Sequence, residues 1–506
     1  MSEQTDLPAH VDVAIVGTGF AGLGMAIKLK QAGREDFVVL ERADDVGGTW
    51  RDNTYPGCQC DVPSNVYSFS FAPNPQWTRT FAPQPEIWDY LRHVTDRYGL
   101  RPHLRFGAEL TGAAWDDDQR LWRIETVRGS LTARVLVGAM GGLSEPAIPR
   151  IPGLDSFAGR TFHSAAWDHD HDLTGRRVAV IGTGASAIQF VPAIQPQVGR
   201  LTVFQRTPPW IMPRKDRPVR PRERALFRLL PAVQQLVRTT VFWGRELTVL
   251  PFMHPKRLGR FPERIARAHL ERSVADPRLR AKLTPDYAVG CKRILLSNEW
   301  YPALSQPNVD VVTDAIAEIR PNGVVTADGR EHAVDTIVFG TGFRVTDMPF
   351  VERLRGSGGR LLADVWREGG MQALRGTTIA GFPNLFLLVG PNTGLGHNSI
   401  VFMIESQLAY AIEALRETER RGAAVFDASP AAQADFNERV QERMQGTVWT
   451  AGGCASWYLD AHGRNTTLWP GASWRFRMET RRFDPAEYAF APAAPPALAR
   501  IPAAVA

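Results

Sequence analysis

The stretch VDVAIVGTGFAGLGMAIKLKQA, residues 11–32, decides how this chain begins to fold. Its apolar start fits a buried parallel strand, and its second half fits a helix. Between them, Gly17 permits a tight turn, Gly19 lets the backbone approach a pyrophosphate, and Gly22 lets helix and strand pack closely. Because the helix N-terminus then faces the phosphates, the stretch predicts a dinucleotide site.

An acid identifies the ligand of this first site more closely. Glu41 ends the strand predicted over residues 37–41. It follows the glycine-rich turn by about 20 residues, where a carboxylate accepts hydrogen bonds from ribose hydroxyls. Since a carboxylate at that place repels a 2′-phosphate, the first site is expected to take FAD or NAD.

The same order of strand, turn and helix recurs around residues 178–206. Its turn runs from Gly182 to Ala187, with alanine at the third fingerprint position, which the fingerprint tolerates. The next strand ends in Gln205-Arg206-Thr207 and has no acid; Arg206 can pair with a 2′-phosphate. The second site therefore favours NADP(H), and the pair of sites predicts hydride transfer from nicotinamide to flavin.

The predicted fold class is α/β, with two Rossmann-like dinucleotide-binding domains, one for FAD and one for NADP. A helical insertion interrupts the NADP domain, and we expect it to pack on its own domain rather than to lie on a membrane surface. The expected boundaries are 1–150 for the first part of the FAD domain, 151–334 for the NADP domain with its insertion at about 214–285, 335–485 for the second part of the FAD domain and 486–506 for a flexible tail.

Composition narrows the classes of protein. The chain has 506 residues, 44% hydrophobic and 22% charged, which is typical of a globular protein with large cores. A formal charge of +6 without a basic run argues against nucleic acid as a partner. Four cysteines provide neither a disulfide framework nor a metal cluster, so no metal is expected. With no leader and no long apolar window, the prediction is a reduced, cytoplasmic protein without a transmembrane segment.

Three classes of flavoprotein fit two such sites: disulfide reductases, redox sensors and oxygen-activating monooxygenases. A reductase needs a cysteine pair after the Gly47-Gly48 turn, but Trp50 stands at the first cysteine position, and Cys58 and Cys60 have the wrong spacing. A non-catalytic redox sensor would need no charged group beside the flavin, so a charged group at that place argues against this class. The monooxygenase class is therefore favoured.

Two longer motifs carry a resemblance to a known family. Phe157, Gly159, His163, Trp167 and Asp168 resemble the fingerprint FxGxxxHxxxW(P/D) of Baeyer–Villiger monooxygenases. A second pattern of that family is filled by Gly47, Gly48, Trp50, Tyr55, Pro56, Gly57 and Asp61. The resemblance spans roughly residues 10–485, and it implies that the fingerprint is a hinge between the domains, with His163 in a structural role rather than as a general base.

The resemblance also implies the activity. An enzyme of this family uses NADPH and dioxygen to insert one oxygen atom next to a ketone carbonyl, which gives an ester or lactone through a flavin C4a-peroxide and a tetrahedral adduct. Sulfoxidation is expected as well, and the alternative is an N- or S-hydroxylating flavin monooxygenase. The identity of the ketone and the oligomeric state stay open.

The resemblance assigns roles to individual residues. Arg293 is the expected catalytic cation, because a guanidinium stays charged while it stabilises the adduct, and Asp61 is expected to hold it. The residues expected to bind FAD are Gly17, Gly19, Phe20, Ala21, Gly22, Glu41, Arg42, Gly48, Thr49, Trp50, Asp52, Asp61, Tyr67, Asn398 and Ile400. Those expected to bind NADP are Gln59, Asp61, Gly182, Thr183, Gly184, Ala185, Ser186, Ala187, Gln189, Arg206, Thr207, Lys292, Arg293 and Trp457.

Overall fold

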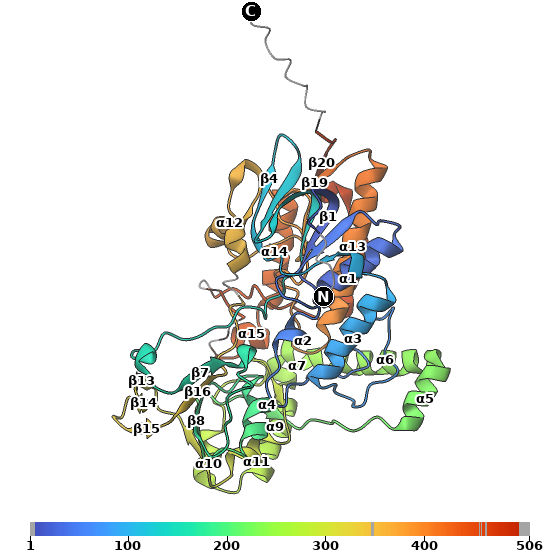
Figure 1. Ribbon diagram of the computed structural model, residues 1–506. Coiled ribbons are helices and arrows are strands. Elements are labelled where there is room, and N and C mark those ends of the chain that lie inside the picture. The colour runs from blue at the N-terminus through green and yellow to red at the C-terminus, as the bar shows by residue number, and fades with distance from the viewer. Residues whose placement is uncertain (1–5, 346–348, 455, 457, 461–462, 495–506) are drawn as a thin grey trace, which may run out of the picture.

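The computed structural model describes residues 6–345, 349–454, 456, 458–460 and 463–494. These residues form two units, each built around a largely parallel sheet, and the two units lie one above the other in Figure 1. The α/β fold predicted from the sequence is confirmed.

The first unit contains an eight-stranded sheet in the order β17-β4-β5-β6-β1-β2-β3, with β18 beside β6. Strand β1 pairs in parallel with both β2 and β6, so it lies inside the sheet and is buried on both faces. This explains its nearly continuous apolar run. The strands are β1 His10–Val16, β2 Phe37–Leu40, β3 Leu104–Arg105, β4 Leu110–Asp116, β5 Leu121–Thr126, β6 Gly129–Gly138, β17 Leu354–Arg355 and β18 Leu385–Leu387.

The second unit contains a five-stranded sheet in the order β12-β9-β8-β16-β7, parallel throughout. Its strands are β7 Arg160–His163, β8 Arg177–Ile181, β9 Arg200–Phe204, β12 Val309–Val312 and β16 Thr336–Phe339. The predicted boundary at residue 335 assigns β16 to the FAD domain. Its pairing with β7 and β8 places it in the second sheet instead, because the strand completes that sheet before the chain returns.

Three small sheets complete the strands. They are β10 Ile211–Met212 with β11 Leu295–Leu296, then β13 Ile316–Arg320 with β14 Gly323–Thr326 and β15 Glu331–Ala333, and β19 Val425–Ala428 with β20 Tyr488–Ala491. Strand β20 lies in the segment predicted to be a flexible tail, so that prediction is wrong for these residues. Tyr488 is buried and exchanges a hydrogen bond with Thr378, which anchors the strand.

Helices cover both sheets. Helix α1 follows the first glycine-rich turn and packs against the long helix α13. The helices are α1 Phe20–Gln31, α2 Thr49–Asp52, α3 Gln84–Arg97, α4 Ala187–Ile194, α5 Pro221–Leu229, α6 Pro231–Glu246, α7 Leu250–Met253, α8 Pro255–Leu258, α9 Arg260–Ser273, α10 Pro277–Lys282, α11 Trp300–Leu304, α12 Leu362–Gly369, α13 Ile400–Arg420, α14 Pro430–Met444, α15 Val448–Ala451 and α16 Ser473–Glu479. Among the described residues, no helix is both long and apolar enough to cross a bilayer.

The insertion is helical, as predicted, but it does not pack only on its own domain. Helix α9 packs beside β10 of the second unit, whereas α6 crosses to the first unit. There Gln234 donates to the carbonyl of Asn74, and Arg238 donates to the carbonyls of Asn65 and Ser68. A buried arginine needs such acceptors, and the loop over residues 65–74 supplies them.

Candidate active site

The first glycine-rich turn has room for a ligand above it and none behind it. Gly17 has φ +106°, and a Cβ there would lie 2.7 Å from the carbonyl oxygen of Ala139. A Cβ on Gly22 would lie 1.9 Å from the oxygen of Gly17. At Gly19, by contrast, the nearest atom would be 4.0 Å away, so its backbone is open to approach. This is the cradle that a pyrophosphate requires.

The segment after Gly47 backs this turn. The amide of Gly47 donates to the carbonyl of Thr18 at 3.0 Å, and Gly48, with φ +51°, packs on the Cα of Gly19. Trp50, on the short helix α2, donates its indole N–H to the hydroxyl of Tyr67 at 3.0 Å. The structure therefore brings together two segments that the sequence assigned separately to FAD.

Glu41 stands beside the same turn. Its Oε2 accepts the amide of Thr18 at 3.0 Å, and its Oε1 accepts the amide of Ala43 and lies 3.0 Å from Nη1 of Arg51. The buried carboxylate is thus held at the end of β2, where a ribose would lie. The guanidinium of Arg42 instead pairs with Glu145 at 2.6 Å, on the linker that leads to the second unit.

The second glycine-rich turn repeats this geometry. Gly182 has φ +108°, and a Cβ there would lie 2.4 Å from the oxygen of Gly340. Gly184 is open, with its nearest neighbour at 3.9 Å. The hydroxyl of Thr183 donates to the carbonyl of Thr207 at 3.3 Å, which ties the turn to the end of β9. The residues present therefore fit a second dinucleotide.

Two cations gather at the edge of this second turn. Burial, followed by the charge of Arg206, lowers the pKa of Lys292, while Asp286 opposes the shift. Arg206 is exposed, and the ammonium of Lys292 lies 5.1 Å from the ring centre of Tyr287. Within the described residues, neither cation has an ion-pair partner within 4.0 Å. Uncompensated positive charge at this point suits a 2′-phosphate.

Arg293 of the second unit and Asp61 of the first unit form an ion pair. The guanidinium donates through Nε at 3.1 Å and through Nη2 at 2.6 and 2.8 Å to the two carboxylate oxygens. Asp61 raises the pKa of Arg293 above its usual value. Burial alone would raise the pKa of Asp61, but the Arg293 guanidinium lowers it, so both groups are charged at neutral pH.

This pair is held yet accessible. The side chain of Arg293 remains 40% exposed and that of Asp61 23%. The loop carrying Asp61 is clamped by Gln189 on α4, whose side-chain amide donates to the carbonyl of Gln59 and accepts its backbone N–H. Tyr55 donates to the same Gln189 oxygen at 3.1 Å. The structure thus brings the predicted NADP-binding residues Gln59 and Gln189 together across the two units.

The fingerprint lies where the two linkers between the units meet. The outgoing and returning chains join through the amide of Ala147, which donates to the carbonyl of Gly342 at 2.8 Å. His163 is buried against them, with its ring 5.8 Å from that of Phe343, and burial lowers its pKa. A Cβ on Gly159 would lie 2.3 Å from the oxygen of Asp335, so only glycine fits there.

The remaining fingerprint residues fix the same segment. Trp167 packs between Phe162 and Phe190, at ring separations of 5.1 and 5.3 Å, and Asp168 pairs with Arg160 at 2.6 Å. Phe157 packs against the core of the second sheet. These contacts connect the fingerprint to the linkers and to α4, which is consistent with a positioning role.

Sequence reasoning missed two charged residues at the end of α6. The charges of Asp61 and Arg293 both act on Arg245, and burial lowers its pKa. Glu246 is buried; burial opposes its ionisation, but hydrogen bonds from His397, Ser473 and Asn398 lower its pKa. Helix α6 therefore links the reaction centre to the start of α13. The available signal was an adjacent Arg-Glu pair in an otherwise mostly uncharged helix.

Asn398, predicted to bind FAD, lies just before the long helix α13. Its side-chain amide donates to Glu246 at 2.6 Å, so this side chain faces α6. Ser399 caps α13, which begins at Ile400, by accepting the amide of Val401 at 3.2 Å. The contact of Asn398 and Ile400 with the flavin stays a prediction.

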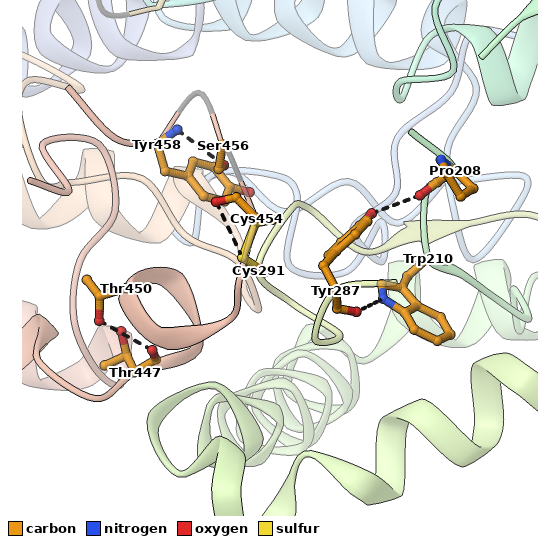
Figure 2. Close-up of a disulfide and its surroundings, with 9 residues drawn as sticks. All are labelled: Pro208, Trp210, Tyr287, Cys291, Thr447, Thr450, Cys454, Ser456 and Tyr458. Atoms are coloured by element: carbon orange, nitrogen blue, oxygen red, sulfur yellow. Dashed lines mark hydrogen bonds between the residues drawn. A yellow bond between two sulfur atoms is a disulfide. The ribbon is translucent and has the colours of Figure 1, made fainter. Parts of the chain in front are cut away.

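A disulfide corrects the expectation that the cysteines are reduced. Cys291 and Cys454, 163 residues apart, are bonded, with their Cα atoms 6.1 Å apart (Figure 2). Sequence counting could not pair them, because only folding brings the two segments together. The bond joins the chain just before Lys292 and Arg293 to the segment carrying Tyr458. Trp457, predicted to bind NADP, lies outside the described residues.

Comparison with known proteins agrees with this geometry. A family model described as pyridine nucleotide-disulphide oxidoreductase matches residues 14–237. A Baeyer–Villiger monooxygenase of Streptomyces coelicolor is 60% identical over 96% of this chain and 94% of its own length. One of Pseudomonas aeruginosa is 51% identical over 95% and 91%.

Solved structures agree as well. Cyclohexanone monooxygenase in its closed form matches with a TM-score of 0.85 and 30% identity, covering 96% of this chain and 100% of the other. Oxidized steroid monooxygenase bound to NADP matches with a TM-score of 0.84 and 32% identity, over 95% and 99%.

Two dinucleotide cradles together with a charged pair that joins the two units define a nicotinamide-dependent flavoprotein oxidoreductase. Within that class, the chain belongs to the Baeyer–Villiger monooxygenases. The predicted family, the FAD- and NADPH-dependent monooxygenase class and the cofactor pair are confirmed. The match to the disulphide oxidoreductase model reflects the shared nucleotide-binding layout, since Trp50 occupies the position where a reductase has its first cysteine.

Proposed function

We propose that this protein oxidises a ketone to an ester or lactone, with FAD bound at the Gly17–Gly22 turn and NADPH at the Gly182–Ala187 turn. The observation that carries the proposal is the Arg293–Asp61 pair, a solvent-accessible guanidinium held by a carboxylate from the other unit. Neither disulfide reduction nor passive redox sensing needs such a group.

Bound FAD, once reduced by NADPH, would activate dioxygen, so that one oxygen atom is inserted beside the carbonyl and the other leaves as water. Gly17 and Gly19 admit its pyrophosphate, and Glu41 orients its ribose. Trp50 and Tyr67 are joined by a hydrogen bond and contact Phe20 through the Tyr67 ring, so they form a rigid aromatic wall on the same side.

Arg293 stabilises negative charge on the substrate oxygen during the insertion. Its bonds to Asp61 use Nε and Nη2, and Nη1 makes no hydrogen bond with the described residues. Two N–H donors are therefore left for a developing oxyanion. Because Asp61 fixes the guanidinium in advance, the donors need no reorganisation, and such preorganised donors contribute roughly 10²–10³ in turnover.

Lys292 and Arg206 select the nicotinamide cofactor. Their positive charges lie together beside the second turn, where they would pair with a 2′-phosphate. His163 and the other fingerprint residues position the linkers between the units, so that the NADP-binding unit can be repositioned relative to the flavin.

The test compares two substrates with the FAD-loaded enzyme. A cyclic ketone and a thioether are each incubated with NADPH, and products are identified by gas chromatography and mass spectrometry. A lactone whose yield falls about 10²–10³-fold in Arg293→Ala, while flavin reduction by NADPH persists, supports the proposal. Sulfoxide from the thioether would extend it. If the ketone is untouched and only an N- or S-oxidised product forms, the reaction is hydroxylation by the same cofactor pair.

A matched control separates the loss of a cation from a general disturbance. Arg267 is an exposed arginine of the helical insertion and, like Arg293, is paired with a carboxylate, that of Glu263. Arg267→Ala should retain product formation. An Arg293→Ala variant that converts ketone as fast as the parent would refute the assignment.

A further inference from the structure

The net positive charge of this protein comes from the helical insertion. Residues 214–285 hold 18 Lys or Arg against 6 Asp or Glu, a formal charge of +12, whereas the whole chain has +6. The remaining 434 residues are therefore net negative, at −6. Charge of opposite sign on two parts of one molecule orients it in an external field.

Helix α6 is amphipathic, but its charged side chains face the protein and its large apolar side chains face the solvent. Its charged residues face inward: Arg238 and Glu246 are buried, and Arg245 is half-buried. The outward face carries Leu236 and Trp243, 66% and 51% exposed. A helix on the surface of a soluble protein normally shows the opposite arrangement.

This outward face forms one continuous apolar stripe. Leu236, Trp243, Leu247 and Leu250 follow at intervals of seven, four and three residues, so they project from the same side of α6 and the turns that continue it. Leu247 is 68% exposed and Leu250 43%. Between residues 232 and 250, every exposed position is uncharged.

The stripe lies in the most apolar part of the described surface. Of fourteen large hydrophobic residues exposed in the described chain, nine fall between residues 226 and 261. Figure 1 shows α5 and α6, in green, extending away from the two sheets. A contiguous apolar patch of this kind marks an interaction site.

Exposed cations bracket the stripe at both ends. Arg222 and Arg228 lie on α5, before the stripe, and Lys256 and Arg257 lie on α8, after it. No ion pair within 4.0 Å is formed by these four side chains with other described residues. Apolar side chains flanked by unpaired cations fit the boundary between headgroups and acyl chains of an anionic bilayer.

We propose that this apolar stripe docks the protein on the surface of an anionic membrane. Trp243 and the leucines enter the headgroup boundary by about 5–10 Å, while the flanking cations pair with lipid phosphates. The net negative remainder of the chain is repelled, which orients α6 towards the lipid. A second copy of this chain fits less well, because a two-fold contact would bring together two insertions that each carry a formal charge of +12.

The docking places α6 between the bilayer and the reaction centre. The outward face of the helix meets lipid, and Arg245 on its inward face interacts with Arg293 and Asp61. The docking surface itself does not depend on the proposed reaction, so each can be tested without the other.

The experiment is co-sedimentation of the full-length, FAD-loaded enzyme with vesicles. Vesicles of phosphatidylcholine alone are compared with vesicles of phosphatidylcholine and phosphatidylglycerol at three to one. We expect the anionic vesicles to bind about tenfold more enzyme, and we expect high salt to abolish the difference. The double variant Trp243→Ser with Leu247→Ser should lose about tenfold of that binding.

Two further variants keep the result decisive. Val127→Ser with Leu143→Ser removes exposed apolar side chains, 62% and 40% exposed, from outside the insertion and should bind as the parent does. Arg257→Gln with Lys256→Gln leaves the apolar residues in place and should lose only the salt-sensitive part. Circular dichroism confirms that each variant is folded.

Several outcomes would overturn the proposal. Parent enzyme that stays in the supernatant with both kinds of vesicle excludes docking. Equal losses in the stripe variant and the Val127 control show binding without a specific face. If sedimentation velocity without lipid shows a dimer that the stripe variant converts to monomer, the stripe is a subunit interface and the proposal is wrong.

Discussion

Replacing Lys292 and Arg206 together by glutamine should convert the nicotinamide preference of this enzyme. Both cations lie beside the second glycine-rich turn without an ion-pair partner among the described residues, and the charge of Arg206 acts on Lys292. A phosphate placed between them would relieve that repulsion. Glutamine stays polar but removes both charges, and because Arg206 is exposed and Lys292 is only half-buried, packing of the turn should survive.

The magnitude follows from the exposure of the two side chains. Lys292 is half-buried, so its charged hydrogen bond to a phosphate contributes roughly 1.5–3 kcal/mol. Arg206 is exposed, so its ion pair with the same phosphate contributes about 0.5–1 kcal/mol after solvent screening. The sum, about 2–4 kcal/mol, corresponds to a loss of about 30- to 700-fold. NADH has no 2′-phosphate and should lose almost nothing.

The assay is anaerobic stopped-flow reduction of the bound flavin, which separates cofactor selection from oxygen chemistry. The ratio of kcat/KM for NADPH to that for NADH is measured for the parent and the double variant. Arg222→Gln with Arg228→Gln, two exposed cations on α5, is the matched control and should leave the ratio unchanged. An equal fall in kcat/KM for both cofactors, or no fall for NADPH, would show that Lys292 and Arg206 do not select the cofactor.

Three other predictions concern the hinge, the pH dependence of stability and the disulfide. Gly159→Ala should destabilise the fold by about 1–3 kcal/mol, because its Cβ would meet the oxygen of Asp335, whereas Gly369→Ala, which meets nothing within 4 Å, should not; thermal unfolding of both variants measures this. Burial raises the pKa of Asp427 to about 7, far above its value of about 3.9 in an unfolded chain. Between those values the folded state holds a proton that the unfolded state has lost, so stability should fall as pH rises from about 4 to 7, and Asp427→Asn should flatten this slope; an unchanged slope in the variant contradicts the assignment. Peptide mapping by mass spectrometry without reductant should yield one peptide pair joined through Cys291 and Cys454, and recovery of both as free thiols would show that the bond is absent.

Local chemistry made much of this protein predictable. Gly17 and Gly182 adopt positive φ at the ends of buried strands. Glycine favours this conformation, so a few adjacent residues are enough to predict each turn. Glu41 and the acid-free end of β9 distinguish the two ligands by charge alone. The fingerprint ending in Trp167-Asp168 is also local, and its His163 does lie at the junction of the two linkers.

The predictions that failed depended on distant contacts. The strand at Thr336–Phe339 looked like the return to the first domain, yet it pairs with β7 and β8. The segment after residue 486 has the composition of a loose tail, but Tyr488 and Phe490 find an aromatic cluster around Phe483. Tertiary contacts override composition where enough apolar surface is buried.

The two nucleotide-binding turns, the order of strands and helices around them, and the family could all be predicted from the amino-acid sequence. The family resemblance also predicted that Asp61 holds Arg293, and the two side chains are paired in the structure. In contrast, the bond between Cys291 and Cys454, and the orientation of α6 with its charges inward and its leucines outward, follow from tertiary packing alone. The two sets of features differ in the separation along the chain over which the responsible interactions act. Backbone conformation and hydrophobic periodicity are set within a few residues, whereas the partner of a buried charge or thiol is set by how whole elements pack.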